Sequence, residues 1–447
     1  MRGHAPLIRA WLLATTIVIA APVSRECSAR NDGGLPEGKF GPFPTVFGGA
    51  TTLRVALWNT GLPDESELYL DIVRKFQHKT PDVQVVPAIL DWQENTQQII
   101  LHELRAQTAP ADIVLLRDAW LPELADEMLS LDAALGGIVR RAYPETVLEA
   151  CRVDGTLLGL PFCARTKCLY YRPGLLRKLQ LKPPRTWDEL PAVAQKLAAE
   201  PTLSGGFGLP ASPSPDSADL LLMVLWAQGG RLVDEEGTLV VGRELLAALE
   251  LWSDLANVAR ATQPMPVVWP QRELEDRFLA GELGMLIAGP RLARHLAMRR
   301  PRLDYAIAPL PEWHTQATRL SVDCLAISAR SPHPELALRF LRHAGQDRFA
   351  KQMCSLGLLS ASRSVGGNAG LRPFVTSLEH ARTPPARLWP TVWPYLANVL
   401  VETLAGRMSA EAALRELLPT DVPSVLRLDE STAAAENEEP ERPPGEP

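Results

Sequence analysis

Short apolar runs alternate with amphipathic segments along the first half of the chain. An extended apolar run spans residues 53–58, and the segment that begins at Pro63 repeats Leu68, Ile72 and Phe76 at intervals of four, which predicts a helix. The same order recurs, with predicted strands at 83–86 and 112–116 and predicted helices at 93–108 and 122–135. Strands that alternate with helices of this length indicate βαβ units, and hence an α/β fold with a mostly parallel sheet.

The second half resumes this alternation after a stretch marked by glycine and proline. Residues 153–173 hold two extended runs joined by a bend at Gly159 and Pro161, which is typical of a chain that leaves one sheet and enters another. Further strands are predicted at 284–288, 305–308 and 322–327, and residues 202–217 are predicted to form a Gly/Pro/Ser-rich loop. A chain of 447 residues can bury more than one core.

The two ends of the chain differ from its body. Basic residues followed by an apolar run within residues 1–29 predict an export signal or an N-terminal anchor, and lipidation at Cys27 is an open alternative. Residues 30–50 are rich in glycine and proline and are expected to be a linker. The segment 428–447 holds seven acids and one base, so it is expected to be a disordered acidic tail. Because the net charge of −6 lies in this tail, the body is neutral and gives no electrostatic sign of nucleic-acid binding.

The sequence lacks the motifs of most enzyme classes. We find no nucleophile elbow, no phosphate-binding loop with its lysine and no metal-ligand spacing, so we expect no cofactor, no metal and no catalysis. A disulfide among Cys151, Cys163 and Cys168 is open in an oxidising compartment. Since a spacing of five places Cys163 and Cys168 on opposite faces of a regular strand, free buried thiols are the favoured prediction.

Several motifs in order resemble one family, the extracytoplasmic solute-binding proteins of ABC transporters, and within it the sugar-binding group that includes maltose-binding protein. The resemblance covers residues 53–418. Its segments are Pro110–Leu116 followed by Leu121-Pro-Glu, Val153-Asp-Gly with Leu160-Pro161, Leu169-Tyr-Tyr171, Thr186-Trp-Asp-Glu-Leu190, Phe278–Pro290, and Leu404–Leu414. In the segment 278–290 the chain has Gly284 where the family usually has alanine.

This resemblance implies a two-lobed, periplasmic-binding-protein-like (type II) clamshell with a hinge and a ligand cleft between its lobes. We assign residues 51–163 and 320–368 to the first lobe, and residues 164–319 and 369–427 to the second. The chain is then expected to cross between lobes near 162–166 and to return near 319–322.

Candidate ligand-binding residues follow from the strand ends and from the resemblance. Arg117, Asp118 and Trp120 come directly after the strand at 112–116. Asp219 lies at the entry of a second-lobe helix, where helix capping is an equal alternative. The resemblance adds Trp58 and Asn59, at the end of the first strand where the family's first-lobe loop contacts the ligand, and Trp393 as a stacking platform for a sugar ring. Arg165 and Arg291 stand where the family often has an acid and a tryptophan.

Three arginines around one cleft leave two interpretations of the ligand. Arg117, Arg165 and Arg291 either recognise an acidic sugar or pair with acids of the protein. We expect a non-enzymatic sugar- or oligosaccharide-binding protein at the periplasmic or extracytoplasmic face of the membrane, which delivers its ligand to the permease subunits of an ABC importer. A membrane-anchored sensor with the same fold is the alternative.

Overall fold

The computed structural model describes residues 51–59, 63–91, 96–105, 110–234, 239–300, 302–363, 370–417 and 426–428. The predicted signal or anchor, the linker and residues 429–447 of the acidic tail lie outside these ranges. Leu428, which was expected to begin that tail, instead ends a short strand, β16 (Leu426–Leu428), paired with β9 (Leu239–Val241). Among the described residues, no helix is both long and apolar enough to cross a membrane.

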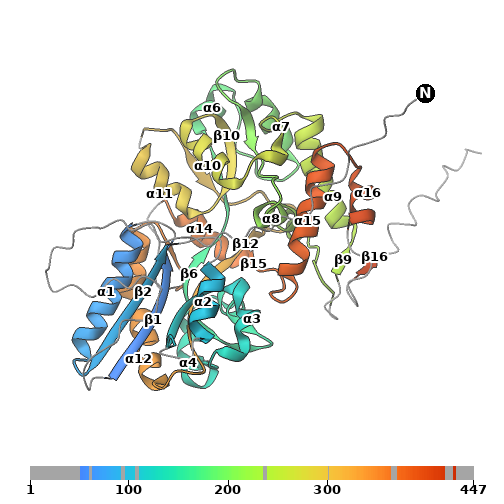
Figure 1. Ribbon diagram of the computed structural model, residues 1–447. Helices are drawn as coiled ribbons and strands as arrows, with labels where there is room; N and C mark the ends of the chain where they lie inside the picture. The colour runs from blue at the N-terminus through green and yellow to red at the C-terminus, as the bar shows by residue number, and fades with distance from the viewer. Residues whose placement is uncertain are drawn as a thin grey trace, which may run out of the picture. The chain divides into compact units, whose positions relative to one another are not determined.

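A six-stranded sheet collects strands from distant parts of the chain (Figure 1). Its order is β14-β6-β13-β3-β1-β2. The strands are β1 (Thr51–Asn59), β2 (Val83–Asp91), β3 (Ile113–Arg117), β6 (Gly159–Arg165), β13 (Ser321–Ile327) and β14 (Leu359–Ser360). The first three pair in parallel, as the βαβ pattern predicted, whereas β13 runs antiparallel to both β3 and β6.

Helices connect and cover this sheet. They are α1 (Pro63–Lys79), α2 (Thr96–Arg105), α3 (Leu121–Leu124), α4 (Asp132–Ala142), α5 (Glu145–Glu149), α12 (Pro334–Ala344) and α13 (Asp347–Ser355). The single helix predicted at 122–135 is wrong. A 3-10 turn at Ala125–Glu127 follows α3. The backbone N–H of Leu129 then donates to Ile327, and that of Leu131 donates to Leu157, so the segment before α4 bonds to strands and forms no helix.

A second sheet has four strands in the order β11-β7-β10-β8. They are β7 (Cys168–Tyr171), β8 (Gly205–Gly208), β10 (Leu283–Ala288) and β11 (Ala306–Ala308). Strand β8 corrects the loop predicted at 202–217. Its glycines allow close packing, because a Cβ on Gly206 would collide with the carbonyl of Ala194 in α7 (Glu189–Ala198). Close packing also explains why the chain has glycine at position 284, since a Cβ there would lie 2.8 Å from the carbonyl oxygen of Gly206.

Only two residues, Thr166 and Lys167, separate β6 of the first sheet from β7 of the second. The return runs through β12 (Thr318–Arg319), which pairs with β15 (Ala381–Arg382), and then enters β13. Strand β6 continues through Arg165, so the link between the two sheets lies at 166–167, at the end of the range predicted for the crossing. Asp323 and Cys324 of β13 pair with Cys163 and Pro161, so β6 has one extra residue, Phe162, at this point, and Pro161 lies inside the strand.

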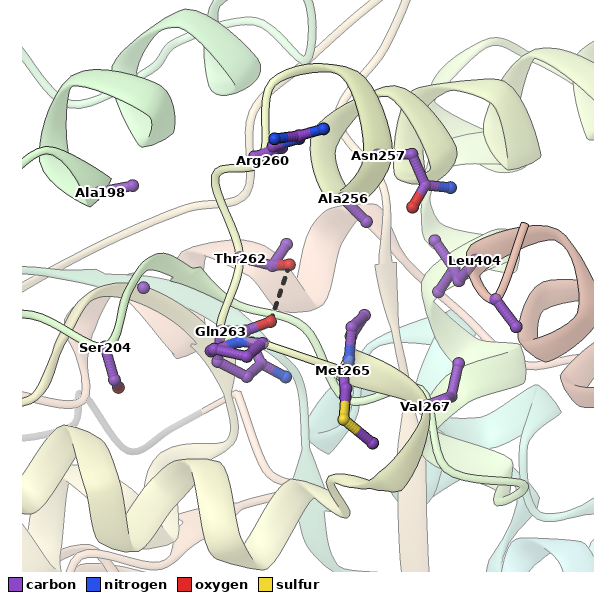
Figure 2. A pocket seen from close by; sticks show the side chains of 14 residues that line it. Ala198, Ser204, Ala256, Asn257, Arg260, Thr262, Gln263, Met265, Val267 and Leu404 are labelled. Atoms are coloured by element: carbon purple, nitrogen blue, oxygen red, sulfur yellow. Dashed lines mark hydrogen bonds between the residues drawn. The ribbon is translucent and has the colours of Figure 1, made fainter.

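The remaining helices surround the second sheet and extend beyond it. They are α6 (Pro173–Lys178), α7, α8 (Pro215–Ala227), α9 (Arg243–Ser253), α10 (Gln271–Ala280), α11 (Pro290–Arg299), α14 (Arg372–Ser377), α15 (Trp389–Leu404) and α16 (Ala410–Leu417). A π-helical turn at Asp254–Val258 ends α9. Between it, the following loop and the end of α15 lies a cavity of about 670 Å³ (Figure 2). Small and apolar side chains form most of its lining.

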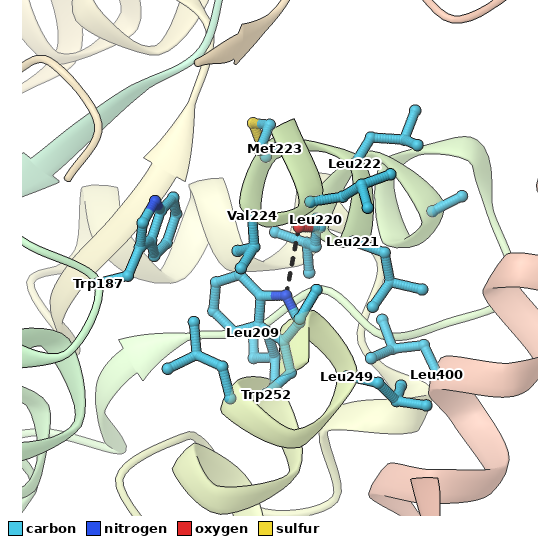
Figure 3. Packing of buried hydrophobic residues seen from close by; sticks show 14 of the residues in the cluster. Trp187, Leu209, Leu220, Leu221, Leu222, Met223, Val224, Leu249, Trp252 and Leu400 are labelled. Carbon is cyan, nitrogen blue, oxygen red and sulfur yellow. Dashed lines mark hydrogen bonds between the residues drawn. The ribbon is translucent and has the colours of Figure 1, made fainter. Parts of the chain in front are cut away.

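Helix α8 is buried along nearly its whole length and packs between α9 and α15 (Figure 3). The indole Nε1 of Trp252 donates to the carbonyl of Leu220 at 3.2 Å, and the ring of Trp252 packs against Trp187 and Phe207. An apolar helix held on all sides has little freedom to move. The few acids that α8 carries are therefore fixed in position.

Candidate functional site

A cavity of about 980 Å³ is lined by residues from strands of the six-stranded sheet, from helices α8, α10, α11 and α15, and from the segments 165–167 and 319–321. This volume lies within the range of roughly 300–1,000 Å³ that is typical of small-molecule sites. The structure brings seven of the nine predicted site residues to this cavity. They are Arg117, Asp118, Trp120, Arg165, Asp219, Arg291 and Trp393.

The other two predicted residues, Trp58 and Asn59, are buried and do not line the cavity. Trp58 is 1% exposed, and its indole Nε1 donates to the carbonyl of Leu115 at 3.0 Å. Its ring carries the guanidinium of Arg117 at 5.1 Å and that of Arg165 at 6.0 Å from the ring centroid. Asn59 is equally buried and donates to the Ser66 hydroxyl at 2.7 Å. In this structure Trp58 supports two arginines that line the cavity.

The three arginines of the predicted site are paired with acids of the protein. Arg165 forms a two-pronged ion pair with Asp323 on the neighbouring strand β13, and Arg117 Nε lies 3.8 Å from the same carboxylate. Burial and the neighbouring Arg165 lower the pKa of Arg117 to about 10. Arg291 Nη2 donates to Glu275 at 3.1 Å. These contacts agree with the second of the two interpretations left open by the sequence.

Side chains of alternating charge line the cavity in a continuous row. Lys167 Nζ donates to Asp216 at 2.7 Å and lies 3.3 Å from Asp219, both on α8. On the other side of Asp219, Arg319 Nε donates to its Oδ1 at 3.1 Å. Arg319 Nη1 then lies 3.9 Å from Asp118. Lys167 and Arg319 sit at the two crossings, so this row ties both crossings to α8.

Burial and the nearby cations act in opposite directions on the pKa values of these acids. It raises the pKa of Asp118 despite Arg319 and Arg117, and it raises the pKa of Asp219 despite Lys167 and Arg319. Burial also opposes the ionisation of Asp216, but there the charge and hydrogen bond of Lys167 outweigh it and lower the pKa. Each of these acids thus lies beside a cation of the protein itself.

Lys167, Asp216, Glu275 and Arg319 line the cavity but were not predicted. Lys167 had a signal in the sequence, since it interrupts two apolar runs at the crossing between sheets. Asp216 and Asp219 are three residues apart, so they share one face of α8. Only the fold shows that this face meets the cavity.

Aromatic side chains complete the lining. Trp393 and Trp389 reach the cavity from the first turns of α15, and Trp120 reaches it from the 3-10 turn after β3. Cys151, Cys163, Cys168 and Cys324 are buried thiols outside any disulfide. This confirms the prediction for Cys163 and Cys168. Planar apolar faces beside hydrogen-bonding groups suit a ligand with both apolar C–H faces and hydroxyl groups.

Comparison with known proteins gives the fold and the family. The solved structures that the chain resembles include maltose-bound MalE3 of T. maritima, with a TM-score of 0.70 at 21% identity over 82% of this chain and 98% of that one. They also include the cyclic alpha-maltosyl-1,6-maltose binding protein of Arthrobacter globiformis, with a TM-score of 0.71 at 21% identity over 83% of this chain and 97% of that one. The predicted two-lobed α/β fold of periplasmic binding proteins is confirmed.

Sequence relatives agree with this result. A protein of Brucella abortus (strain 2308) that is named as a binding protein is 25% identical over 363 residues, which cover 78% of this chain and 87% of the relative. The family model described as bacterial extracellular solute-binding protein matches residues 71–371, more than half of the chain. The chain belongs to the family of bacterial extracellular solute-binding proteins.

Proposed function

We propose that the protein captures a neutral sugar or oligosaccharide in the 980 Å³ cavity and delivers it to an ABC importer. The observation that carries this proposal is the convergence on one cavity of Trp393, Trp120 and a set of paired charges from the elements of two sheets. Sugar rings present apolar faces and hydroxyl rims, and this lining matches both. The solved relatives that bind maltose or cyclic maltosyl-maltose support the ligand class.

The division into two lobes belongs to the same proposal. The two short crossings, at 166–167 and at 320, are the natural hinge because each leaves one sheet and enters another within one or two residues. Closure about these crossings would change the surface that a transporter meets, which is how ligand binding is signalled to permease subunits. A relative in Deinococcus radiodurans is named as an ABC transporter-binding protein, which supports that partner. The location outside the cytoplasmic membrane follows from the family; the mode of anchoring remains a proposal.

The pairing of the arginines favours a neutral ligand over an acidic one. A ligand carboxylate bound by Arg165 or Arg291 would have to displace Asp323 or Glu275, and the buried Glu275 would then lose its cation. Hydroxyl groups require no such exchange. An acidic sugar is therefore the less favoured of the two ligand classes.

A thermal-shift panel tests the proposal, because a ligand that binds only the native state raises its melting temperature. The panel contains maltose, maltotriose, D-tagatose and ribitol as neutral compounds and D-glucuronate and D-galacturonate as acidic ones. We expect shifts with neutral members only, and loss of the shift in Trp393→Ala. A shift confined to the acidic members would contradict the neutral ligand. No shift with any member would contradict a sugar-binding function.

A further inference from the structure

Two hydrogen-bonding atoms at the cavity differ from the paired groups around them. Arg319 Nη1 and Gln271 Oε1 are both buried, and neither has a hydrogen-bond partner among the residues that the structure describes. Both residues line the cavity. A buried polar atom without a partner is costly, so such atoms at a ligand cavity indicate where a ligand completes the hydrogen bonding.

The guanidinium of Arg319 is held in one orientation. The residue is 8% exposed, and its Nε donates to Asp219 at 3.1 Å. Nη1 is 3.9 Å from Asp118 Oδ2, which is too long for a hydrogen bond. Because the guanidinium is planar and only donates, fixing Nε also fixes the direction in which Nη1 offers its hydrogens.

The side-chain amide of Gln271 is fixed from the other side. Its Nε2 donates to the carbonyl of Ile287 at 3.0 Å and lies 3.3 Å from Glu275 Oε1. Both neighbours are acceptors, so the NH₂ group must face them and the oxygen must face away. Oε1 is therefore an acceptor that requires an O–H or N–H group from outside the protein's own network.

We propose that Arg319 Nη1 donates to, and Gln271 Oε1 accepts from, hydroxyl groups of the bound sugar, an inference that rests on the proposed function. A hydroxyl group can serve either atom, because it both donates and accepts. An ionised carboxylate can satisfy Arg319 but has no hydrogen for Gln271. The two residues thus determine specificity for neutral, hydroxyl-rich ligands. A ligand bound by both would bridge β12, which carries Arg319, and α10, which carries Gln271.

Two conservative variants test this assignment. Gln271→Met keeps the approximate length of the side chain and removes the acceptor, and Arg319→Lys keeps a cation for Asp219 but removes Nη1. Matched controls are Gln195→Met, at an exposed glutamine on α7, and Arg407→Lys, in the exposed pair with Glu402. Each protein is titrated calorimetrically with whichever of maltose, maltotriose, D-tagatose and ribitol binds the wild type. The melting temperature without ligand is measured in parallel.

We expect Gln271→Met and Arg319→Lys each to weaken binding by about tenfold, the effect of losing one well-made hydrogen bond, while both controls bind as the wild type does. We also expect the unliganded melting temperature of Gln271→Met to stay near that of its control. Binding by Gln271→Met at wild-type affinity would overturn the assignment and leave the proposed function standing. A loss of affinity that merely follows a loss of unliganded stability would overturn it too. If the wild type binds no sugar of the panel, the proposed function fails first and the assignment fails with it.

Discussion

At the scale of single residues, Lys167 is a cation shared by two acids, the buried Asp219 and the partly exposed Asp216. It lies beside both at the point where the chain crosses between the sheets. We expect Lys167→Met to destabilise the protein by about 3 kcal/mol, because it leaves the buried carboxylate of Asp219 with one partner fewer. Urea denaturation measures this loss. The comparison is Lys178→Met, whose lysine is 63% exposed in its pair with Glu200 and whose loss should cost about 1 kcal/mol or less. Equal losses would contradict the structural role of Lys167.

A buried histidine predicts how stability depends on pH. His343 on α12 lies against Phe76 and Phe349, and its Nε2 is 3.2 Å from the carbonyl of Ile72. Burial and the nearby Arg348 lower its pKa to about 4. The unfolded chain, with a pKa of about 6.5, therefore takes up this proton first as the pH falls. The stability that His343 contributes is fully present above about pH 6.5. It is lost as the pH falls from about 6.5 to 4, on the order of 1 kcal/mol per pH unit.

His343→Gln should flatten this part of the profile, measured as the free energy of unfolding at steps of pH. The control is His78→Gln, at an exposed histidine near the end of α1, which should keep the wild-type slope. A wild-type slope in His343→Gln would show that other groups cause the pH dependence.

The sequence predicted those site residues that stand next to a recognisable local pattern, such as the end of a strand. Arg117 and Asp118 end an obvious strand, and Trp393 stands at a recognisable place in the C-terminal helix. Arg319 and Glu275 have no such marker, because what makes them part of the site is the packing of β12 and α10 against segments far away in the chain. Trp58 shows the opposite case, since its position at the strand end is right but its ring points into the wall.

At the scale of elements, glycines decide how closely β8 approaches α7. We expect Gly206→Ala to destabilise the protein by about 3 kcal/mol or to prevent folding, because the added methyl group meets backbone that cannot move aside. Gly137→Ala is the matched control. A Cβ at Gly137 meets nothing within 4 Å, and alanine in the helix α4 should raise the free energy of unfolding by about 0.5–1 kcal/mol. Denaturant unfolding of both variants measures the difference, and a fully stable Gly206→Ala would contradict the observed packing.

An ion pair joins α11, which lies beside the second sheet, to α1, which covers the first sheet. Arg294 is buried and donates to Asp64, which is half exposed. We expect Arg294→Met to loosen this connection, so that the unliganded protein has a larger radius of gyration by small-angle scattering. The ligand-saturated form should keep the wild-type value. Arg407→Met, which removes an exposed pair within one helix end, serves as the control. An unchanged radius in Arg294→Met would mean that this pair does not hold the two parts together.

The pattern of apolar residues predicted the elements well where period and length agree, as in β1, α1, β10 and β13. It failed at β8, because glycines that serve close packing look the same as glycines that serve a loop. It also failed at 122–135, where hydrogen bonds from Leu129 and Leu131 to distant strands override a helical pattern. Both failures have tertiary causes that no local window contains.

At the scale of the whole molecule, two sheets are joined by the short crossing at 166–167 and by a return through β12, and the charges at these two places meet at a cavity. The cavity is lined by residues beside each of the two sheets, so a bound solute would contact both parts at once. Such contacts stabilise the conformation in which the two parts are close, and this is the physical basis of closure on a ligand. The family, the fold and the cavity lining thus support one account of solute capture.

The most direct test is to fill the cavity and measure binding. Ala119 lines it on the 3-10 turn after β3, and Ala119→Trp would occupy ligand space. The control is Ala192→Trp, at an exposed position of α7. Calorimetric titration with the sugar that most raises the wild-type melting temperature should give one site per chain in wild type and Ala192→Trp, and no measurable binding in a folded Ala119→Trp. Wild-type affinity in Ala119→Trp would place the solute elsewhere and contradict the account.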